Sequence, residues 1–256
     1  MKVSNILTLS LALLFLTSCV GNSNLEEVMI PDPEIISIVE LGSPNDVKAN
    51  EGSFELTKLN YKYNEYIPFL DSKSLELHYA TYYLKATNKL NKLVKDTEYE
   101  NMKISTLLNK VKYNDTQIEE CAVDYFNHSF FFSILGKENY KNPTGELMDQ
   151  IVTDFGSYTA LKSEFTTTAR ENNGGWVWLI QNKAGQLSIV HSSDNTNPLL
   201  RSFKQKGNPL LVLDLSEHAY FLKYNFNKND YIFNFFKAIN WEVVEQKHLE
   251  YLGITE

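Results

Sequence analysis

Apolar side chains recur at helical spacing along residues 71 to 96, and this periodicity predicts a helix there. Asp71 or Ser72 stands at its start, where either side chain is suited to cap the free backbone N–H groups of a first turn. His78 is therefore expected on a helix, near apolar neighbours. The apolar positions of this helix are Leu75, Leu77, Tyr82, Leu84, Leu90 and Leu93.

A second helical pattern covers residues 115 to 135 and becomes very aromatic toward its end. Asp115 or Thr116 is the candidate capping residue, and His128 lies within the predicted helix. We therefore expect residues 54 to 140 to be mostly helical.

The second half of the chain alternates helices with β-like runs. Residues 176 to 181 and 187 to 191 are the first two strands, and the polar, glycine-containing stretch 182 to 185 indicates a hairpin turn between them. A third β-like run, residues 209 to 213, leads directly into Asp214. The order of these elements predicts an α+β fold. Two more helices are expected near the end, at residues 230 to 240 and 242 to 252.

The first residues resemble an export signal. Lys2 precedes an apolar run over residues 6 to 16, which is short for a membrane-spanning helix and typical of a signal peptide covering residues 1 to 18. The run ends in LTSC, which looks like a bacterial lipobox, so Cys19 is the expected lipidation site and mature N-terminus. The alternative is an ordinary signal peptide with a coincidental cysteine.

Residues 19 to 53 contain prolines, glycines and acids, and we interpret them as a tether between membrane and domain. An apolar interruption at residues 35 to 41 is expected to dock on the domain or to pair as an edge strand. A helical-hairpin domain over residues 54 to 140 and an α/β domain over residues 141 to 256 follow. This organisation predicts a lipid-anchored, extracytoplasmic protein of the bacterial cell envelope, in the periplasm or on the cell surface.

Charge and cysteine content add two constraints. The chain carries a formal net charge of −8, and we expect no nucleic-acid partner. Its two cysteines are Cys19 and Cys121, so lipidation of Cys19 excludes an intramolecular disulfide. Cys121, on the second predicted helix, is expected to be a buried free thiol.

Three imidazoles and one carboxylate can hold a redox metal and leave a position open for a small ligand. The residues alone do not establish such a site, because a histidine on an apolar helix face is often a hydrogen-bonded core residue, and an aspartate four residues before a histidine can simply orient its imidazole. Two further histidines, His191 and His248, are expected at the surface.

Four segments, from about residue 54 to residue 250 and in order, resemble the iron/manganese superoxide dismutases. FELTKLNYKYNEYIPFLDSKSLELHY is similar to the family's opening, and its histidine, His78, matches the first ligand. DYFNHSFFFSIL is similar to the second metal helix and contains His128. DFGSYTALKSEFTTTARENNGGWVWLIQNKAGQLSIV is close to the family's long helix, W-x-W strand and hairpin. LVLDLSEHAYFLKYNFNKNDYIFNFFKAINW matches the D-x-W-E-H-A-Y-Y segment and contributes Asp214 and His218.

The resemblance implies one iron or manganese ion per subunit at these four residues, and superoxide as the substrate. The implied reaction is dismutation to oxygen and hydrogen peroxide while the metal alternates between +3 and +2. The implied fold is an N-terminal helical hairpin followed by a small antiparallel sheet wrapped by helices. In this family a glutamate beside the last ligand reaches across a two-fold axis, and Glu217 beside His218 keeps that pair, so we expect a homodimer.

Several positions depart from the family pattern around the metal. Ala86 stands where the family has a gateway tyrosine, and Tyr82 and Tyr83 replace two histidines. Ser216 replaces the tryptophan of D-x-W-E-H, and Phe221 replaces the second tyrosine of the A-Y-Y run. We expect the histidine–tyrosine bridge of the dimer to be absent, and rate and redox tuning to change more than metal binding.

Four side chains are candidates for catalytic roles at this altered site. Asp124 stands where iron-type members carry the glutamine that bonds the solvent ligand of the metal, and Asn195 stands where manganese-type members carry it. Tyr82 lies one helical turn before Ala86 and is expected to place its phenol in the vacated gateway. Lys228 falls where the family has a funnel arginine and keeps its positive charge; the alternative is a solvated surface lysine.

The resemblance favours iron over manganese. The pair His78 and Tyr79, Asp124 at the iron-type position, the NPTG run at residues 142 to 145 and the bulky Val212 all point to the iron branch. The function predicted from the sequence is a superoxide dismutase of the cell envelope. The alternative is a non-dismutase metal-binding or redox protein on the same scaffold.

Overall fold

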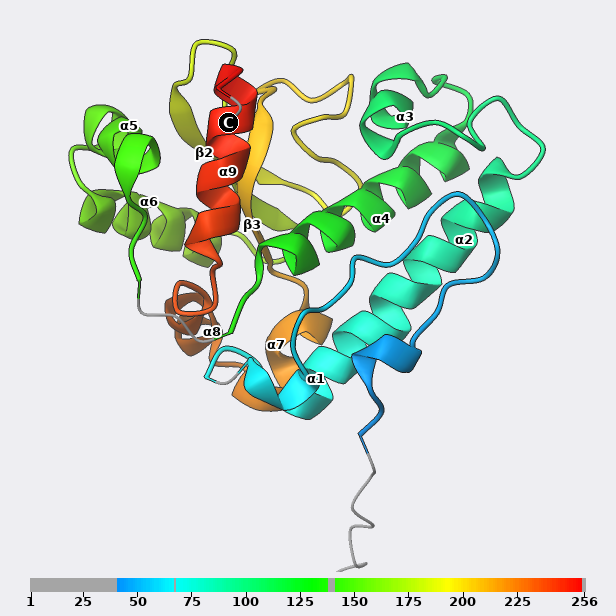
Figure 1. Ribbon diagram of the computed structural model, residues 1–256, viewed down its shortest axis with the longest axis horizontal. Coiled ribbons are helices and arrows are strands. Elements are labelled where there is room, and N and C mark those ends of the chain that lie inside the picture. The colour runs from blue at the N-terminus through cyan, green and yellow to red at the C-terminus, as the bar shows by residue number, and fades with distance from the viewer. Residues whose placement is uncertain (1–40, 67, 138–140, 255–256) are drawn as a thin grey trace, which may run out of the picture. The chain divides into compact units, whose positions relative to one another are not determined.

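The computed structural model describes residues 41–66, 68–137 and 141–254, and Figure 1 shows how their helices and strands are arranged. The predicted signal peptide, Cys19 and most of the predicted tether lie outside these residues. Within the described part of the chain, no helix combines the length and the apolar character needed to cross a membrane.

The helix expected over residues 71 to 96 is confirmed as one continuous helical run. Asp71 caps its start, because its carboxylate accepts a hydrogen bond from the backbone N–H of Ser74 at 2.8 Å. A π-helical segment in the middle adds a residue to the turn, a feature that is frequent at functional sites. The run consists of α1 (Ser72–Leu77), the π-helical η3 (His78–Tyr83) and α2 (Leu84–Val94).

The second arm of the hairpin is α4 (Thr116–Ile134), which packs beside α2 (Figure 1). A short helix, α3 (Ile104–Lys110), lies between the two arms in sequence and packs on α4. Asp115 precedes α4 as expected, but its carboxylate accepts a hydrogen bond from the Tyr99 hydroxyl at 2.6 Å instead of capping the helix.

Residues 54 to 140 are mostly helical, as expected, but their first part is not. Residues 54 to 70 contain no α-helix and only the short 3-10 turn η2 (Tyr63–Glu65) among those the structure describes. They run along the hairpin and are fixed to it by side-chain hydrogen bonds, such as that from Phe54 N to Asn91 Oδ1 at 2.9 Å. Bonds of this kind leave no periodicity in the sequence.

The described end of the predicted tether also lies against the hairpin. It contains the 3-10 turn η1 (Pro44–Asp46). The backbone N–H of Gly42 donates to Glu76 Oε1 at 2.7 Å, and that of Asn50 donates to Asn88 Oδ1 at 2.7 Å. These contacts dock residues 42 to 50 on α1 and α2.

The three strands form an antiparallel sheet in the order β2-β1-β3. The predicted hairpin is confirmed, and Asn182 N donates to Gln186 O at 2.9 Å to close its turn. The register places Trp176, at the start of β1, opposite Asp214, the last residue of β3. The strands are β1 (Trp176–Gln181), β2 (Leu187–Ser192) and β3 (Asn208–Asp214).

Helices surround this sheet, which confirms the α+β fold with its N-terminal hairpin (Figure 1). They are α5 (Gly145–Phe155), α6 (Tyr158–Glu171), α7 (Glu217–Tyr224), α8 (Lys228–Phe235) and α9 (Trp241–Leu252). α5 and α6 pack on β2, and α9 packs on β3. The helix expected at residues 230 to 240 begins earlier, because the Asn227 side chain accepts a bond from Asp230 N and so caps its start, and it ends at Phe235.

Two expectations about single side chains have different outcomes. Cys121 is a buried free thiol, as expected. The expectation that His248 lies at the surface is wrong: it is 1% exposed, and its Nδ1 lies 2.8 Å from Gln181 Oε1. His191 is half-buried, and its Nε2 lies 3.0 Å from the carbonyl oxygen of Gly174.

Candidate metal centre

Four elements bring the four predicted ligands together. One ligand atom from each of these side chains lies within 4.8 Å of all the others. His78 is the first residue of η3, His128 lies on α4, Asp214 ends β3 and His218 is in the first turn of α7. The Nε2 atoms of His78 and His218 lie 3.3 and 3.1 Å from Asp214 Oδ2.

The ligand atoms have no hydrogen-bond partner within the described protein, although they are buried. This holds for Nε2 of the three histidines and for Asp214 Oδ2. Buried nitrogen and oxygen atoms of this kind cost free energy unless something binds them. Three imidazole nitrogens and one carboxylate oxygen facing one point form a donor set that suits iron or manganese. The residues therefore fit the metal that the sequence predicted.

Hydrogen bonds on the outer side of two of the ligands, His128 and Asp214, fix their orientation. His128 Nδ1 lies 2.9 Å from the backbone carbonyl oxygen of Asp124 and 3.0 Å from the carboxylate of the same residue. Both are acceptors, so the network assigns the proton to Nδ1 and leaves the Nε2 lone pair for the metal. Asp214 Oδ1 accepts a bond from Ser216 N at 2.8 Å, which leaves Oδ2 facing the centre.

Aromatic rings enclose the imidazoles. Phe131 stacks on His78 with ring centroids 5.1 Å apart, and Trp176 meets His128 edge-on at 5.2 Å. Tyr82 stacks on His218 at 4.0 Å, with the two ring planes 14° apart. Such rings exclude water and limit the rotation of the ligands.

Burial sets the protonation of the ligands. It lowers the pKa of His78 to about 3, so this imidazole is neutral, as a metal ligand must be. Burial acts against the charge of Asp214 too, but the neighbouring imidazoles of His218 and His78 outweigh it and hold its pKa well below the usual range. For His128, burial is outweighed by the bond and charge of Asp124, which raise its pKa.

A pocket of about 420 Å³ opens beside the centre. Two ligands form part of its wall, so the pocket connects the metal position with the surface. The other lining residues are mostly polar or charged. They are Lys89, Glu120, Cys121, Asp124, Trp176, Asp194, Asn195 and Ser216, with His128 and His218 as the ligands.

The predicted catalytic side chains occupy different places. Asp124 and Asn195 line this pocket, and Asp124 contacts His128. Tyr82 is 39% exposed and covers the ring of His218. The Lys228 amine donates to the carbonyl oxygen of Asn172 at 2.6 Å and does not line the pocket. The roles assigned to these residues stay predictions.

Sequence reasoning missed Lys89, which projects from α2 into the pocket wall. It is the one cation among the described residues that line this pocket. Lys85 and Lys92 stand near it on the same helix, and no motif separates Lys89 from them. Only the three-dimensional arrangement identifies it.

Comparisons with known proteins agree with this geometry. Residues 53–136 match the family described as iron/manganese superoxide dismutases, alpha-hairpin domain. Residues 143–247 match the C-terminal domain of the same dismutases.

Individual relatives are similar over most of their length. The chain is 34% identical to the superoxide dismutase (Fe) of Salmonella typhimurium over 75% of this chain and 96% of that protein. It is 34% identical to the superoxide dismutase (Mn) of Acinetobacter baylyi, over 77% and 88%. With the superoxide dismutase (Fe) of Escherichia coli K12 the identity is 32%, over 75% and 96%.

Sequence, fold and ligand geometry therefore lead to one assignment. His78, His128, Asp214 and His218 form an intact site for an iron or manganese ion. The chain belongs to the iron/manganese superoxide dismutase family and is an enzyme of that family.

Proposed function

We propose that this enzyme dismutates superoxide with iron in the bacterial cell envelope, held to the membrane by a lipid on Cys19. The observation that carries the reaction is the convergence of four unpaired ligand atoms at one buried point. The location rests on the sequence alone, on the LTSC run that ends the apolar segment.

The metal, when bound, supplies one-electron redox chemistry. The chain's own residues prepare the site for it. His78, His128 and His218 each present one imidazole nitrogen, and Asp214 adds one negative charge at a fixed position. The surrounding rings exclude water, so charges within the site interact more strongly than they would in solvent.

Superoxide is an anion, and a chain with a net charge of −8 repels it at long range. Its approach therefore depends on positive charge close to the site. We infer that Lys89 supplies this charge, because it lines the pocket beside two ligands. Glu120, Asp124 and Asp194 line the same pocket and act against it.

The surroundings of the metal also favour a slower reaction than the family pattern would give. The Asp124 carboxylate bonds His128 and adds negative charge near the metal, which stabilises the oxidised state. Ser216 lines the pocket and Ala86 is buried, so small side chains occupy two positions where the family pattern has rings. We expect a wider pocket and a lower reduction potential.

Iron is proposed from sequence features, because iron and manganese relatives are equally similar at 34% identity. Asp124 at the iron-type position and the NPTG run at residues 142 to 145 support it. Loading the chain with each metal and measuring activity separates the two. Higher activity with manganese would contradict the choice of iron without affecting the reaction.

A homodimer is proposed around α7. Glu217, beside the ligand His218, is exposed and free to reach a partner subunit. Phe221 and Phe226 form an exposed edge-to-face pair 5.2 Å apart, and Phe226 is 77% exposed. Exposed aromatic side chains next to the Glu217 carboxylate are consistent with an interface between two subunits.

The test of the function uses the full chain with Cys19→Ala, which cannot be lipidated, loaded with iron or manganese. We expect one metal ion per chain and catalytic removal of superoxide in a stopped-flow measurement. One bound ion per chain without superoxide removal would favour a metal-binding or redox protein on this scaffold. A separate measurement, the membrane fraction of the wild-type chain against Cys19→Ala in bacterial cells, tests the lipid anchor.

A further inference from the structure

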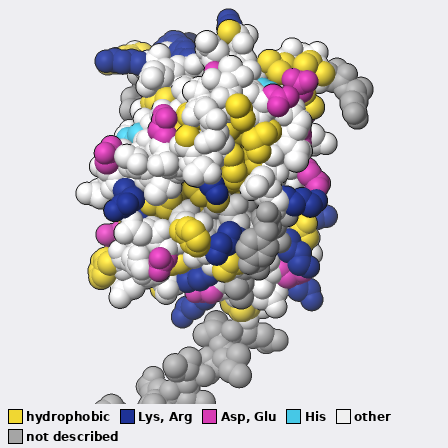
Figure 2. All heavy atoms as spheres, turned by 90° about the vertical axis from the view of Figure 1, so that its left-hand side faces the viewer, with side chains coloured by type: hydrophobic (Ala, Val, Ile, Leu, Met, Phe, Trp, Pro, Cys, Tyr) yellow, Lys and Arg dark blue, Asp and Glu magenta, His cyan; other side chains and the backbone are white. Residues whose placement is uncertain are grey.

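A second pocket lies on the face of the molecule that carries α5, α6 and α8. Its volume is about 550 Å³, and it is formed mainly by α6 and α8. Figure 2 looks onto this face and shows hydrophobic side chains gathered next to lysine and arginine side chains. None of the residues that line it lines the pocket at the metal centre, so the two sites are separate.

The charge of this pocket is opposite to that of the chain. Lys141, Lys162, Arg170 and Lys237 line it, and none of the lining residues is acidic, although the net charge of the chain is −8. Lys141 pairs with Glu242 at 3.0 Å. No described carboxylate forms an ion pair with the other three, so their charge is available to a ligand.

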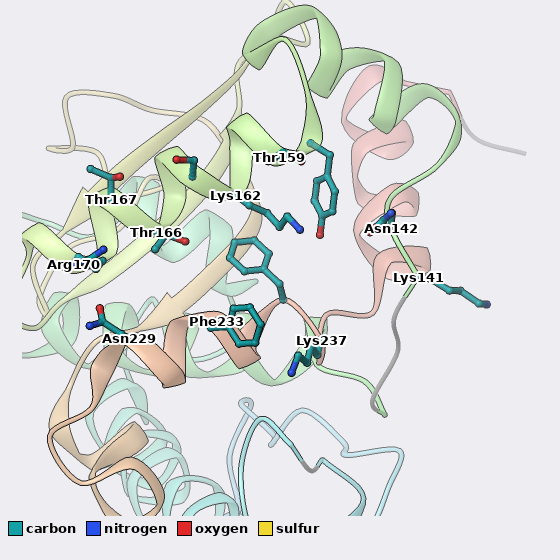
Figure 3. Close-up of a pocket in the computed structure, with 13 residues that line it drawn as sticks. Lys141, Asn142, Thr159, Lys162, Thr166, Thr167, Arg170, Asn229, Phe233 and Lys237 are labelled. Carbon is teal, nitrogen blue, oxygen red and sulfur yellow. The ribbon is translucent and has the colours of Figure 1, made fainter.

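Hydroxyl groups lie between these cations along one face of α6. Thr159, Lys162, Thr166 and Arg170 follow each other at intervals of three or four residues, which places them on one side of a helix. Figure 3 shows this row facing Phe233 of α8 across the pocket. The row offers guanidinium, ammonium and hydroxyl donors together, and such a set matches the several acceptor oxygens of a phosphate group.

The opposite wall is aromatic. Phe233 is 65% exposed, and the Lys237 amine lies 4.6 Å from the centre of its ring. Phe236 continues this wall. Tyr158 lines the pocket from α6, and the Lys162 amine lies 4.6 Å from the centre of its ring. An exposed aromatic ring beside held ammonium groups provides contact for the apolar part of a ligand.

We propose that this pocket binds an amphiphile with a phosphate head and an apolar substituent. The phosphate contacts Lys162, Arg170 and the hydroxyl of Thr166, and the apolar part lies on Phe233. The same chemistry is available from a phospholipid in a bilayer or from a soluble phosphate ester with a short apolar chain. Either ligand would be bound independently of the metal centre.

The test uses the full metal-loaded chain with Cys19→Ala as the common background, so that no anchor contributes to binding. Calorimetry measures its affinity for monomeric dihexanoyl phosphatidic acid, dihexanoyl phosphatidylcholine and inorganic phosphate. The variants are Lys162→Gln with Arg170→Gln, and Phe233→Ser. The matched control is Lys103→Gln with Lys110→Gln, which removes two exposed charges at α3.

We expect phosphatidic acid to bind at least about tenfold more tightly than the other two probes, and the Lys162→Gln, Arg170→Gln variant to lose at least about tenfold. Phe233→Ser should weaken phosphatidic acid and leave inorganic phosphate unchanged, and all variants should keep wild-type superoxide removal. Equal weakening by the α3 control, or unchanged binding in the pocket variants, would overturn the proposal.

A second measurement identifies the source of the ligand. Sedimentation with phosphatidylglycerol vesicles, but not with phosphatidylcholine vesicles, and its loss in the Lys162→Gln, Arg170→Gln variant, would assign the site to a membrane lipid. Binding of the monomeric probe without vesicle sedimentation would assign it to a soluble ligand. Absence of both would overturn the proposal, and because superoxide removal is measured separately, this result leaves the proposed function untouched.

Discussion

Three of the four ligands of the metal centre are each held by a neighbour that contributes chemistry of its own. His128 is bound through Nδ1 by Asp124, Asp214 is oriented by the backbone of Ser216, and the His218 ring is covered by Tyr82. Such contacts fix the donor atoms before the metal arrives, so less ordering is needed when it binds.

Replacing His128 by Ala should remove most of the metal, because three donors remain at a site built for four. We expect the metal content and affinity to fall by at least about tenfold, since even outer partners of ligands contribute that much. Elemental analysis of the purified full chain measures it. His191→Gln, which changes an imidazole outside the site, is the control, and wild-type metal content in His128→Ala would contradict the assignment.

Replacing Asp124 by Asn should raise the reduction potential of the metal. The amide oxygen still accepts a bond from His128, but the negative charge beside the ligand is gone. Because half of the Asp124 side chain is exposed, solvent screens the effect, and we expect a change of about 60 mV or less, the equivalent of tenfold in a one-electron equilibrium.

Redox titration of the loaded protein measures the potential of this variant. Glu120→Gln removes a charge from the same pocket at a residue that does not contact a ligand, so it separates the effect of a charge beside His128 from the general field of the pocket. Equal shifts in both variants would mean that the position of the Asp124 charge beside His128 has no special role.

Replacing Lys89 by Gln should slow the reaction with superoxide. One charge at roughly 8 Å from the path of an anion is worth about 0.5 kcal/mol in water, which corresponds to a two- to threefold lower rate at low salt. The difference should shrink as ionic strength rises. Stopped-flow rates at several salt concentrations measure it. Lys85→Gln, on the same helix but outside the pocket, should keep the wild-type rate, and a loss of equal size there would exclude a local role for Lys89.

At the level of helices and strands, periodicity carries most of the predictable information. The arms of the hairpin and the strands are predictable because their buried faces repeat regularly. α3 has only seven residues and was missed. The π segment at the first ligand was not predicted either, because one extra residue in a turn leaves no mark in the pattern.

The burial of His248 was not predicted, because a histidine counts as polar in a pattern of apolar positions. Its spacing from Trp241 and Val244 nevertheless places it on the buried face of α9.

The turn before β1 offers a test of how an element positions the site. Gly175 has φ +72°, and a Cβ there would overlap the carbonyl oxygen of Ser192 on β2. Its own carbonyl accepts a bond from Leu215 N at 2.9 Å, one residue after the ligand Asp214. We expect Gly175→Ala to lower the free energy of unfolding by about 2 kcal/mol or more and to weaken metal binding as well.

Gly174→Ala is the matched control for this turn. Gly174 has φ +96°, but a Cβ added to it would meet no described atom within 4 Å, so an alanine there carries the backbone strain without the overlap. Chemical denaturation of both variants separates the two effects. Equal destabilisation would mean that contact with β2 does not matter, and unchanged metal affinity in Gly175→Ala would disconnect the turn from the site.

Across the whole molecule, the metal site depends on parts of the chain that are distant in sequence. The periodicity places two histidines on helices and one pair after a strand, but it contains nothing about their convergence, and only the resemblance to a family joins them. The charges that line the pocket beside the site cannot be predicted from the sequence either. Its charges come from α2, α4 and the loop after β2, and such a local field exists only once these elements meet.

The proposed dimer can be tested through Glu217. If Glu217 reaches across a two-fold axis to the partner's ligand, Glu217→Arg places a positive charge against an imidazole that is bound to a metal cation. Breaking a buried charged contact of this kind costs about 3 kcal/mol, and a two-fold dimer contains it twice, so the dissociation constant of the dimer should rise by more than about 100-fold. Glu250→Arg, at an exposed position on α9, makes the same charge change and should have no effect.

Analytical ultracentrifugation of the metal-loaded chain distinguishes the outcomes. With Cys19→Ala as the common background, we expect the parent chain to sediment at twice its monomer mass, and Glu217→Arg to show monomer at concentrations where the parent shows none. Superoxide removal should fall together with the dimer, because His218 loses its outer partner. A parent chain that remains monomeric at all concentrations would contradict the dimer, and the exposed pair Phe221 and Phe226 would then not belong to an interface between two copies of this chain.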